Sequence, residues 1–252
     1  MSTTNASSSN HRARSEKPRK RESKKTRVLK KAIESKHPVK QSIADYRSYV
    51  RKHYDGLPGA MLTVTGFVTG HEALAGRLIH PRAFDVRGCK RLLDAGCGDG
   101  RYSKFMLRHA DAGAMITGFD YSRQMLTRAR RRLKTPRVSH VAADLSKLPY
   151  ADQSFDAVVC GWVLEHLPDP RPGLSELSRV MQPGGKLLLM VTEDTFSGAI
   201  CSRLWHCRTH NRTDLQAIAK ECGLVWHREH WLSRWHARVR MGGIIVELRK
   251  EG

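Results

Sequence analysis

The chain has 252 residues, 40% of them hydrophobic, which suffices for one large α/β domain with an arm. Its formal net charge is +21, and residues 1–42 carry 13 Lys/Arg against 3 Asp/Glu. The six cysteines form no C-x-x-C pair, which argues against a zinc ribbon and favours a reducing compartment. Because no apolar run approaches the roughly 20 residues of a membrane span and no signal peptide is recognisable, we expect a cytoplasmic protein.

Residues 1–42 are rich in Ser, Asn, Thr, Lys and Arg and contain little that could be buried. They predict a disordered basic arm. The arm is equally compatible with a solvated tail and with weak electrostatic contact to nucleic acid or another polyanion. Residues 43–252 are expected to form the folded domain, beginning with two or three helices over 43–82.

From Lys90 onward, strand-like and helix-like segments alternate along the chain. Strands are predicted at 91–95, 115–120, 138–142, 155–161, 186–192, 223–231 and 244–249. Helices are predicted at 100–110, 122–133, 171–181 and 212–222, the third ended by Pro183-Gly184-Gly185. This alternation favours an α/β fold with a doubly wound, mostly parallel seven-stranded sheet and helices on both faces.

The strongest motif is Leu92–Gly100, which reads Leu-Leu-Asp-Ala-Gly-Cys-Gly-Asp-Gly between the first strand and the first helix. Gly96 and Gly98 lack a Cβ, so the backbone can turn sharply and approach a ligand closely. A dinucleotide fingerprint would require its third glycine at Arg101, and no P-loop lysine follows. The motif therefore indicates a nucleotide-like ligand of another kind, bound at a helix N-terminus.

Two carboxylates follow at the ends of the second and third predicted strands. Asp120 can accept hydrogen bonds from both hydroxyls of a ribose, and Tyr121 can pack against an adenine face. Asp144 can accept from an adenine amino group, while the Leu145 N–H can bond a ring nitrogen. A helix N-cap is the alternative role for either carboxylate alone.

Four segments in order resemble the class I S-adenosylmethionine-dependent methyltransferases, particularly the branch that includes the ubiquinone and menaquinone methyltransferases. They are the glycine turn, Gly118–Ser122, Ala143–Tyr150, and Ser154–Cys160 continuing into Val163–Leu167. The resemblance spans about residues 90–192 and implies a Rossmann-like fold, with S-adenosyl-L-methionine as cofactor and the 43–82 helices over the cofactor and acceptor side. The cofactor-binding residues we predict are Asp94, Gly96, Cys97, Gly98, Asp120, Tyr121, Met125, Asp144, Leu145 and Cys160.

The resemblance also implies in-line methyl transfer, for which the protein supplies alignment and a dry pocket. The catalytic residues remain unassigned. Glu165 and His166 follow the fourth strand, and His166 has the chemistry of a general base. We favour instead a role for this pair in anchoring a helix start.

The pattern after the fourth strand bears on the methyl acceptor. Cys160-Gly161-Trp162-Val163 stands where enzymes that methylate amino groups of bases or glutamine carry N/D-P-P-Y/F. Cys160 also lacks the proline neighbour of a cytosine-C5 nucleophile, so we expect a core thiol lining the cofactor floor. We therefore expect a small-molecule or lipid-like acceptor. RNA or a ribosome-associated protein is one alternative, and a catalytically silent cofactor-binding module is another.

Two features near the C-terminus invite other interpretations. The segment with Cys201, His206, Cys207 and His210 could suggest zinc, but we expect an acceptor-side lid without metal. The late tryptophans, interleaved with basic residues, could stack nucleobases. We expect them to fill a core edge instead; they are Trp205, Trp226, Trp231 and Trp235.

Overall fold

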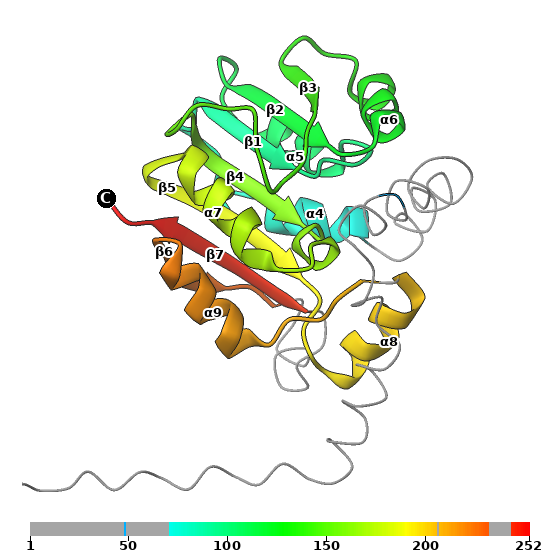
Figure 1. Ribbon diagram of the computed structural model, residues 1–252. Helices are drawn as coiled ribbons and strands as arrows, with labels where there is room; N and C mark the ends of the chain where they lie inside the picture. The colour runs from blue at the N-terminus through cyan, green and yellow to red at the C-terminus, as the bar shows by residue number, and fades with distance from the viewer. Residues whose placement is uncertain (1–47, 49–70, 206, 232–242) are drawn as a thin grey trace, which may run out of the picture. The chain divides into compact units, whose positions relative to one another are not determined.

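The computed structural model describes residues 48, 71–205, 207–231 and 243–252, all within a compact unit that runs from His37 to Gly252 (Figure 1). The predicted arm over 1–42 lies outside the described residues. Of the helices predicted over 43–82, the described part is α4, His71–Leu78. Within the described ranges, no helix is long and apolar enough to cross a membrane.

Seven strands form one sheet in the order β3-β2-β1-β4-β5-β7-β6. The first five strands run parallel, while β7 is antiparallel to both of its neighbours. This arrangement confirms the predicted doubly wound, mostly parallel sheet. The strands are β1 Arg91–Ala95, β2 Met115–Asp120, β3 Val138–Ala142, β4 Phe155–Gly161, β5 Met181–Val191, β6 Leu224–Glu229 and β7 Ile244–Lys250.

Helices cover both faces of this sheet, and two of the described helical segments were not predicted. The expected helices are α5 Arg101–His109, α6 Arg123–Leu133, α7 Pro170–Val180 and α9 Arg212–Glu221. The unpredicted ones are α8, Phe196–Trp205, and the single 3-10 turn η1, Leu164–His166. The expected start of β5 was also wrong. Met181 already pairs with Phe155, and the Pro-Gly-Gly segment lies in a register shift within the strand pairing.

Side chains alternate between the two faces along each strand, as the twofold period of a strand requires. Leu92 of β1 packs in one cluster with Phe105 of α5 and Ala75 of α4. The next residue, Leu93, packs in the opposite cluster with Leu177 of α7 and others from α9. Figure 1 shows α7 and α9 on the near side of the sheet. Both faces are buried, which explains the almost continuous apolar character of β1 and β4.

The strand order reverses direction between β1 and β4. From β1 the chain passes through α5 to β2 on one side, whereas from β4 it passes through α7 to β5 on the other. Ligands of open α/β sheets bind in the crevice outside the carboxyl ends of the strands at such a switch point. Here that crevice lies beyond Ala95 and Gly161.

Candidate functional site

The glycine turn joins the carboxyl end of β1 to α5 in a conformation that few side chains tolerate. Gly96 and Gly98 have left-handed φ angles of 69° and 53°. A Cβ at Gly96 would lie 2.3 Å from a methyl carbon of Val163, so no larger residue fits. A Cβ at Gly98 would meet nothing within 4 Å. The backbone at Gly98 therefore borders open space, as close approach of a ligand to the main chain requires.

Asp94 lies fully buried beneath this turn. Its Oδ2 atom accepts hydrogen bonds from the Ser103 backbone N–H at 2.8 Å and from the Ser103 hydroxyl at 2.6 Å. Its Oδ1 atom is buried with no hydrogen-bond partner among the described residues. Burial raises the pKa of Asp94 to about 7. A buried acceptor without a donor is costly, so this oxygen suits a donor supplied by a bound ligand.

Asp120 ends β2 and reaches across to the glycine turn. Its Oδ2 accepts from the Gly98 N–H at 2.9 Å, and its Oδ1 accepts from the Ser122 N–H at 2.8 Å. The N-cap of α6 is Ser122, whose hydroxyl accepts from the Met125 N–H, so Asp120 does not have the alternative role of helix cap. Each carboxylate oxygen has two acceptor sites, and Asp120 can therefore hold the turn and still bind ligand hydroxyls.

The third strand contributes a second acidic turn at the same edge. Asp144 accepts from the backbone N–H and the hydroxyl of Ser146, at 2.8 and 2.7 Å. The carboxylate thus closes a short local turn, and no helix follows for it to cap. Leu145 is buried in the core cluster on the α7 face. The predicted site residues at the carboxyl ends of β1, β2 and β3 therefore lie along three adjacent strands of the sheet.

The remaining predicted residues are three buried side chains and one exposed ring. Cys97 is buried and its N–H donates to the Phe119 carbonyl at 2.8 Å. Cys160 is fully buried on β4, and burial raises the pKa of its thiol well above the usual range, so it is not a nucleophile. Met125 is buried at the start of α6, whereas Tyr121 is 41% exposed beside Asp120.

Glu165 and His166 form part of η1, after β4. The buried Glu165 carboxylate accepts from the N–H and the hydroxyl of Thr192, at 2.9 and 3.0 Å. Burial raises the pKa of Glu165, while burial lowers that of His166 to about 4. Asp169 caps α7, whereas Glu165 fastens the 3-10 helix η1, to which the pair belongs, to Thr192 directly after β5.

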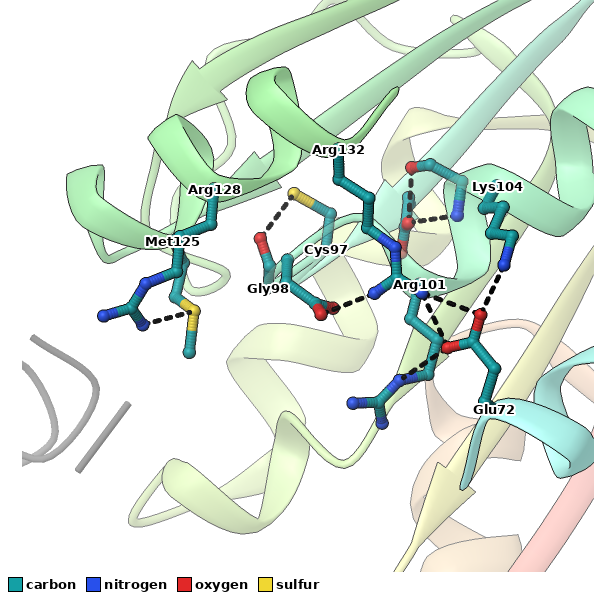
Figure 2. A network of polar contacts seen from close by, with 11 residues as sticks. Glu72, Cys97, Gly98, Arg101, Lys104, Met125, Arg128 and Arg132 are labelled. Atoms are coloured by element: carbon teal, nitrogen blue, oxygen red, sulfur yellow. Dashed lines mark hydrogen bonds and ion pairs between the residues drawn. The ribbon is translucent and has the colours of Figure 1, made fainter. Parts of the chain in front are cut away.

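Sequence reasoning missed an ion-pair network that ties α4 to the glycine turn (Figure 2). The Glu72 carboxylate on α4 lies 2.8 Å from the Lys104 ammonium and 2.7 Å from the Arg132 guanidinium, with Arg101 at 3.7 Å. Arg132 also binds Asp99, within the turn, at 2.5 Å. The spacing of the two cations on α5 is helical, but nothing in the sequence identifies Glu72 as their partner.

The segment after β5 is held by a second ion-pair cluster. Buried Glu193 accepts two hydrogen bonds from Arg212, both at 3.0 Å, and Arg212 also pairs with Glu229 at 2.7 Å. The Arg212 guanidinium lies 5.0 Å from the centre of the Trp231 ring. His210 is buried, and burial lowers its pKa to about 4. These contacts join Glu193, which precedes α8, to Arg212, which follows it, and so fix both ends of the segment that contains α8.

The metal and tryptophan interpretations concern the same region. Across the part of the chain that is described, no three His, Cys, Asp or Glu side chains are grouped to hold a metal ion. His206 and Trp235 lie outside the described residues. Trp226 packs half-buried against the core cluster of the α7 face, as expected for a core edge.

Comparisons with known proteins point in one direction. A family model for a methyltransferase domain matches residues 93–189. Demethylmenaquinone methyltransferase of Clavibacter sepedonicus is 42% identical over 114 residues, which cover 45% of each chain. A probable S-adenosylmethionine-dependent methyltransferase of Mycolicibacterium smegmatis is 33% identical over 186 residues, which cover 70% of this chain and 68% of the relative.

Solved structures support the fold. Magnesium protoporphyrin IX methyltransferase from Synechocystis PCC 6803, with bound SAH, superposes with a TM-score of 0.64 at 21% identity and covers 82% of this chain and 100% of its own. At this identity the likeness concerns the fold alone. The chain spans about half the length of several curated relatives that it matches.

Proposed function

Since this chain belongs to the S-adenosylmethionine-dependent methyltransferases, we propose that it transfers a methyl group from S-adenosyl-L-methionine to a small-molecule acceptor of the quinol type. The observation that carries the proposal is the glycine turn with its buried carboxylate. The open space at Gly98 and the unpartnered Oδ1 of Asp94 fit a nucleoside-like ligand with a cationic donor. The same turn would not fit a pyrophosphate, because neither fingerprint for that group is present.

Each cofactor-binding residue has a role that its position supports. Asp94 would bind a donor on the cofactor through its unpartnered oxygen, and Asp120 would accept from the ribose hydroxyls while it holds the Gly98 N–H. Asp144 and the Leu145 N–H would contact the adenine, with Tyr121 against the ring. Cys97, Met125 and Cys160 would line the site with apolar atoms.

S-adenosyl-L-methionine supplies a methyl group made electrophilic by its sulfonium. The chain's own residues have to align the acceptor and exclude water from the crevice. Glu165 holds Thr192 through one carboxylate oxygen, and burial lowers the pKa of His166 to about 4, so His166 is a weak base near neutral pH. The contribution that we assign to the described residues is therefore binding and orientation. Methylation of a quinol at a ring carbon would release the proton of that carbon, and no residue is assigned to accept it.

The acceptor class rests on the named relatives. The Clavibacter sepedonicus relative is a demethylmenaquinone methyltransferase, and it is 42% identical to this chain over 114 residues. A reduced naphthoquinone is an electron-rich ring that can attack a methyl group through carbon. The RNA alternative draws on charge and on the late tryptophans, of which Trp226 packs against the core. Several cations of basic α6 are engaged within the fold, among them Arg128 with the Met125 sulfur and Arg132 with Glu72.

The basic arm and the compartment complete the proposal. We propose that residues 1–42 form an arm outside a methyltransferase domain over 43–252, and that the protein works in the cytoplasm. The arm would make weak, salt-sensitive contacts with polyanions because it holds a net charge of +10. Deletion of the arm should leave the melting temperature nearly unchanged and reduce the salt dependence of RNA binding. A large loss of thermal stability would contradict this domain division.

The proposed activity is tested with the full-length protein, methyl-labelled S-adenosyl-L-methionine and demethylmenaquinol kept reduced. We expect label in the quinol, and none when Gly96→Val replaces the wild type. The absence of transfer to demethylmenaquinol and to a benzoquinol analogue, from a protein that binds the cofactor, would overturn the acceptor class. Label in RNA or protein from a lysate would support the alternative acceptors.

A further inference from the structure

The backbone at Trp162 adopts a conformation that is costly for a bulky residue. Its φ angle is 61°, in the left-handed region. Two other described non-glycine residues share this region: Lys134, which ends α6, and Gln153, which lies exposed in the turn before β4. Helix ends and tight turns commonly adopt left-handed angles, whereas Trp162 directly follows a central strand. Such strain persists only where the surroundings impose it.

The surroundings of Trp162 come from three separate parts of the chain. Its N–H donates to the Met190 carbonyl at 2.8 Å, which fixes the backbone to β5. Its indole meets the His71 ring of α4 edge-on, with centroids 6.3 Å apart and planes at 78°. A Cβ on Gly243, just before β7, would lie 3.2 Å from two of its ring carbons.

The position of Trp162 is at the switch point of the sheet. Cys160 pairs with Ala95 of β1, so Trp162 lies two residues beyond the point where β4 and the glycine turn diverge. The ring of Tyr102, from the helix that follows the glycine turn, would be 2.6 Å from a Cβ at Gly161. Trp162 is partly buried and packs against the core cluster of the α4 and α5 face, and its indole Nε1 is buried with no hydrogen-bond partner among the described residues. A buried donor without an acceptor suits a partner supplied by a ligand in this crevice.

We propose that Trp162, supported by His71, contacts the methyl acceptor and selects for a planar unsaturated ring. This inference rests on the proposed function and names the residue that recognises the quinol. Aromatic side chains favour offset or edge-on contacts with flat rings. The left-handed backbone directs the indole into the position between α4 and the start of β7. A residue with an ordinary negative φ would direct its side chain elsewhere. Trp162 is thus a specificity residue, and no proton transfer is assigned to it.

The test compares Trp162→Gly and Trp162→Phe with wild type in the full-length protein. Glycine tolerates the left-handed angle and removes the ring, whereas phenylalanine keeps a smaller ring. The matched control is Gln153→Gly, which also places glycine at a left-handed residue, with a φ of 54°, but in the turn before β4 and not after it. The readouts are the KM for demethylmenaquinol, the preference for this two-ring quinol over a one-ring benzoquinol, the Kd for S-adenosyl-L-homocysteine and the Tm.

We expect Trp162→Gly to raise the quinol KM by about tenfold, the scale of one lost aromatic contact. Its Kd for S-adenosyl-L-homocysteine should stay within about twofold of wild type, a difference too small to reflect a lost contact. Trp162→Phe should fold and lower the two-ring preference. Gln153→Gly should change none of the ligand values. An unchanged KM and preference in both Trp162 variants would overturn the inference, as would equal losses of acceptor and cofactor affinity, which indicate a purely structural role.

A second measurement separates this inference from the proposed function. If the wild type methylates no quinol, the proposed function fails, and binding of 1,4-naphthoquinone to the S-adenosyl-L-homocysteine complex then becomes the readout. Binding by wild type that is lost in Trp162→Gly would support the ring contact. Equal binding by both proteins, or none by wild type, would overturn it.

Discussion

Replacement of Asp120 by alanine removes a carboxylate that joins β2, the glycine turn and α6. In the free protein the Gly98 N–H and the Ser122 N–H lose their acceptors. Gly98 is partly exposed, whereas Ser122 is buried, so the unfolding free energy should fall by about 1–3 kcal/mol. The same carboxylate is proposed to accept from the ribose hydroxyls. Loss of a hydrogen bond to a charged acceptor costs about 1.5–3 kcal/mol, so cofactor affinity should fall about ten- to hundredfold.

Calorimetric titration with S-adenosyl-L-homocysteine and a thermal melt of the same sample separate the two effects. Asp120→Asn is the matched variant, because its amide oxygen can still accept from the Gly98 N–H while the charge is lost. Its amide NH2 would face the Ser122 N–H, which is also a donor, so we expect a stability between those of wild type and Asp120→Ala. We also expect it to bind the cofactor product less tightly than wild type. An Asp120→Ala protein that is folded and binds within about twofold of wild type would refute the assignment of Asp120 to the ribose.

Three further perturbations test other parts of the site. Gly96→Val should abolish cofactor binding and lower the Tm, because its Cβ would lie 2.3 Å from a Val163 methyl carbon. A folded variant that binds S-adenosyl-L-homocysteine with wild-type affinity in calorimetry would contradict this. Asp94 has a pKa of about 7 in the folded protein, against an ordinary value of 3.8. Between pH 3.8 and pH 7 the folded state therefore binds more protons than the unfolded state. The free energy of unfolding should fall by about 2–4 kcal/mol as the pH rises from about 4 to about 7. Asp94→Asn should flatten this dependence in urea melts, and an equal slope in both proteins would show that Asp94 does not cause it. Glu72→Gln leaves Arg132 and Lys104 without their shared carboxylate, which should cost about 2 kcal/mol and lower the Tm by about 4–8 °C. The more exposed Lys104→Gln is its control, and equal losses in both variants would argue against Glu72 as the centre of the network.

Local patterns were sufficient to predict most of the sheet. β1 and β4 are short apolar runs bounded by turn residues, and the glycine turn lies where the first strand ends. The start of β5 was misplaced because Pro183 and two glycines usually end an element, whereas here they lie within a register shift of the strand pairing. α8 was missed because its apolar residues do not form one buried face: Phe196 is 73% exposed and Ile200 is 49% exposed.

The candidate site was predictable only where its residues follow one another along the chain. Asp94, Gly98 and Asp120 occur at motif spacing, and the sheet brings them to one edge. Contacts between distant positions carry no local signal. Glu72 and Arg132 are 60 residues apart, and Glu165 and Thr192 are 27 apart. The left-handed backbone of Trp162 depends on β5, α4 and the start of β7 together, so the sequence around it gives no indication of that angle.

The most direct test of the account is a titration of the full-length protein with S-adenosyl-L-homocysteine, run beside Gly98→Ala. The new methyl group would point into space that contains no protein atom within 4 Å, so the variant should fold with a modest cost from the left-handed φ of 53°. We predict one binding site in the wild type and at least about tenfold weaker binding in Gly98→Ala, because the methyl group takes the place of the ligand. No binding by the wild type, or equal binding by both proteins, would contradict the account.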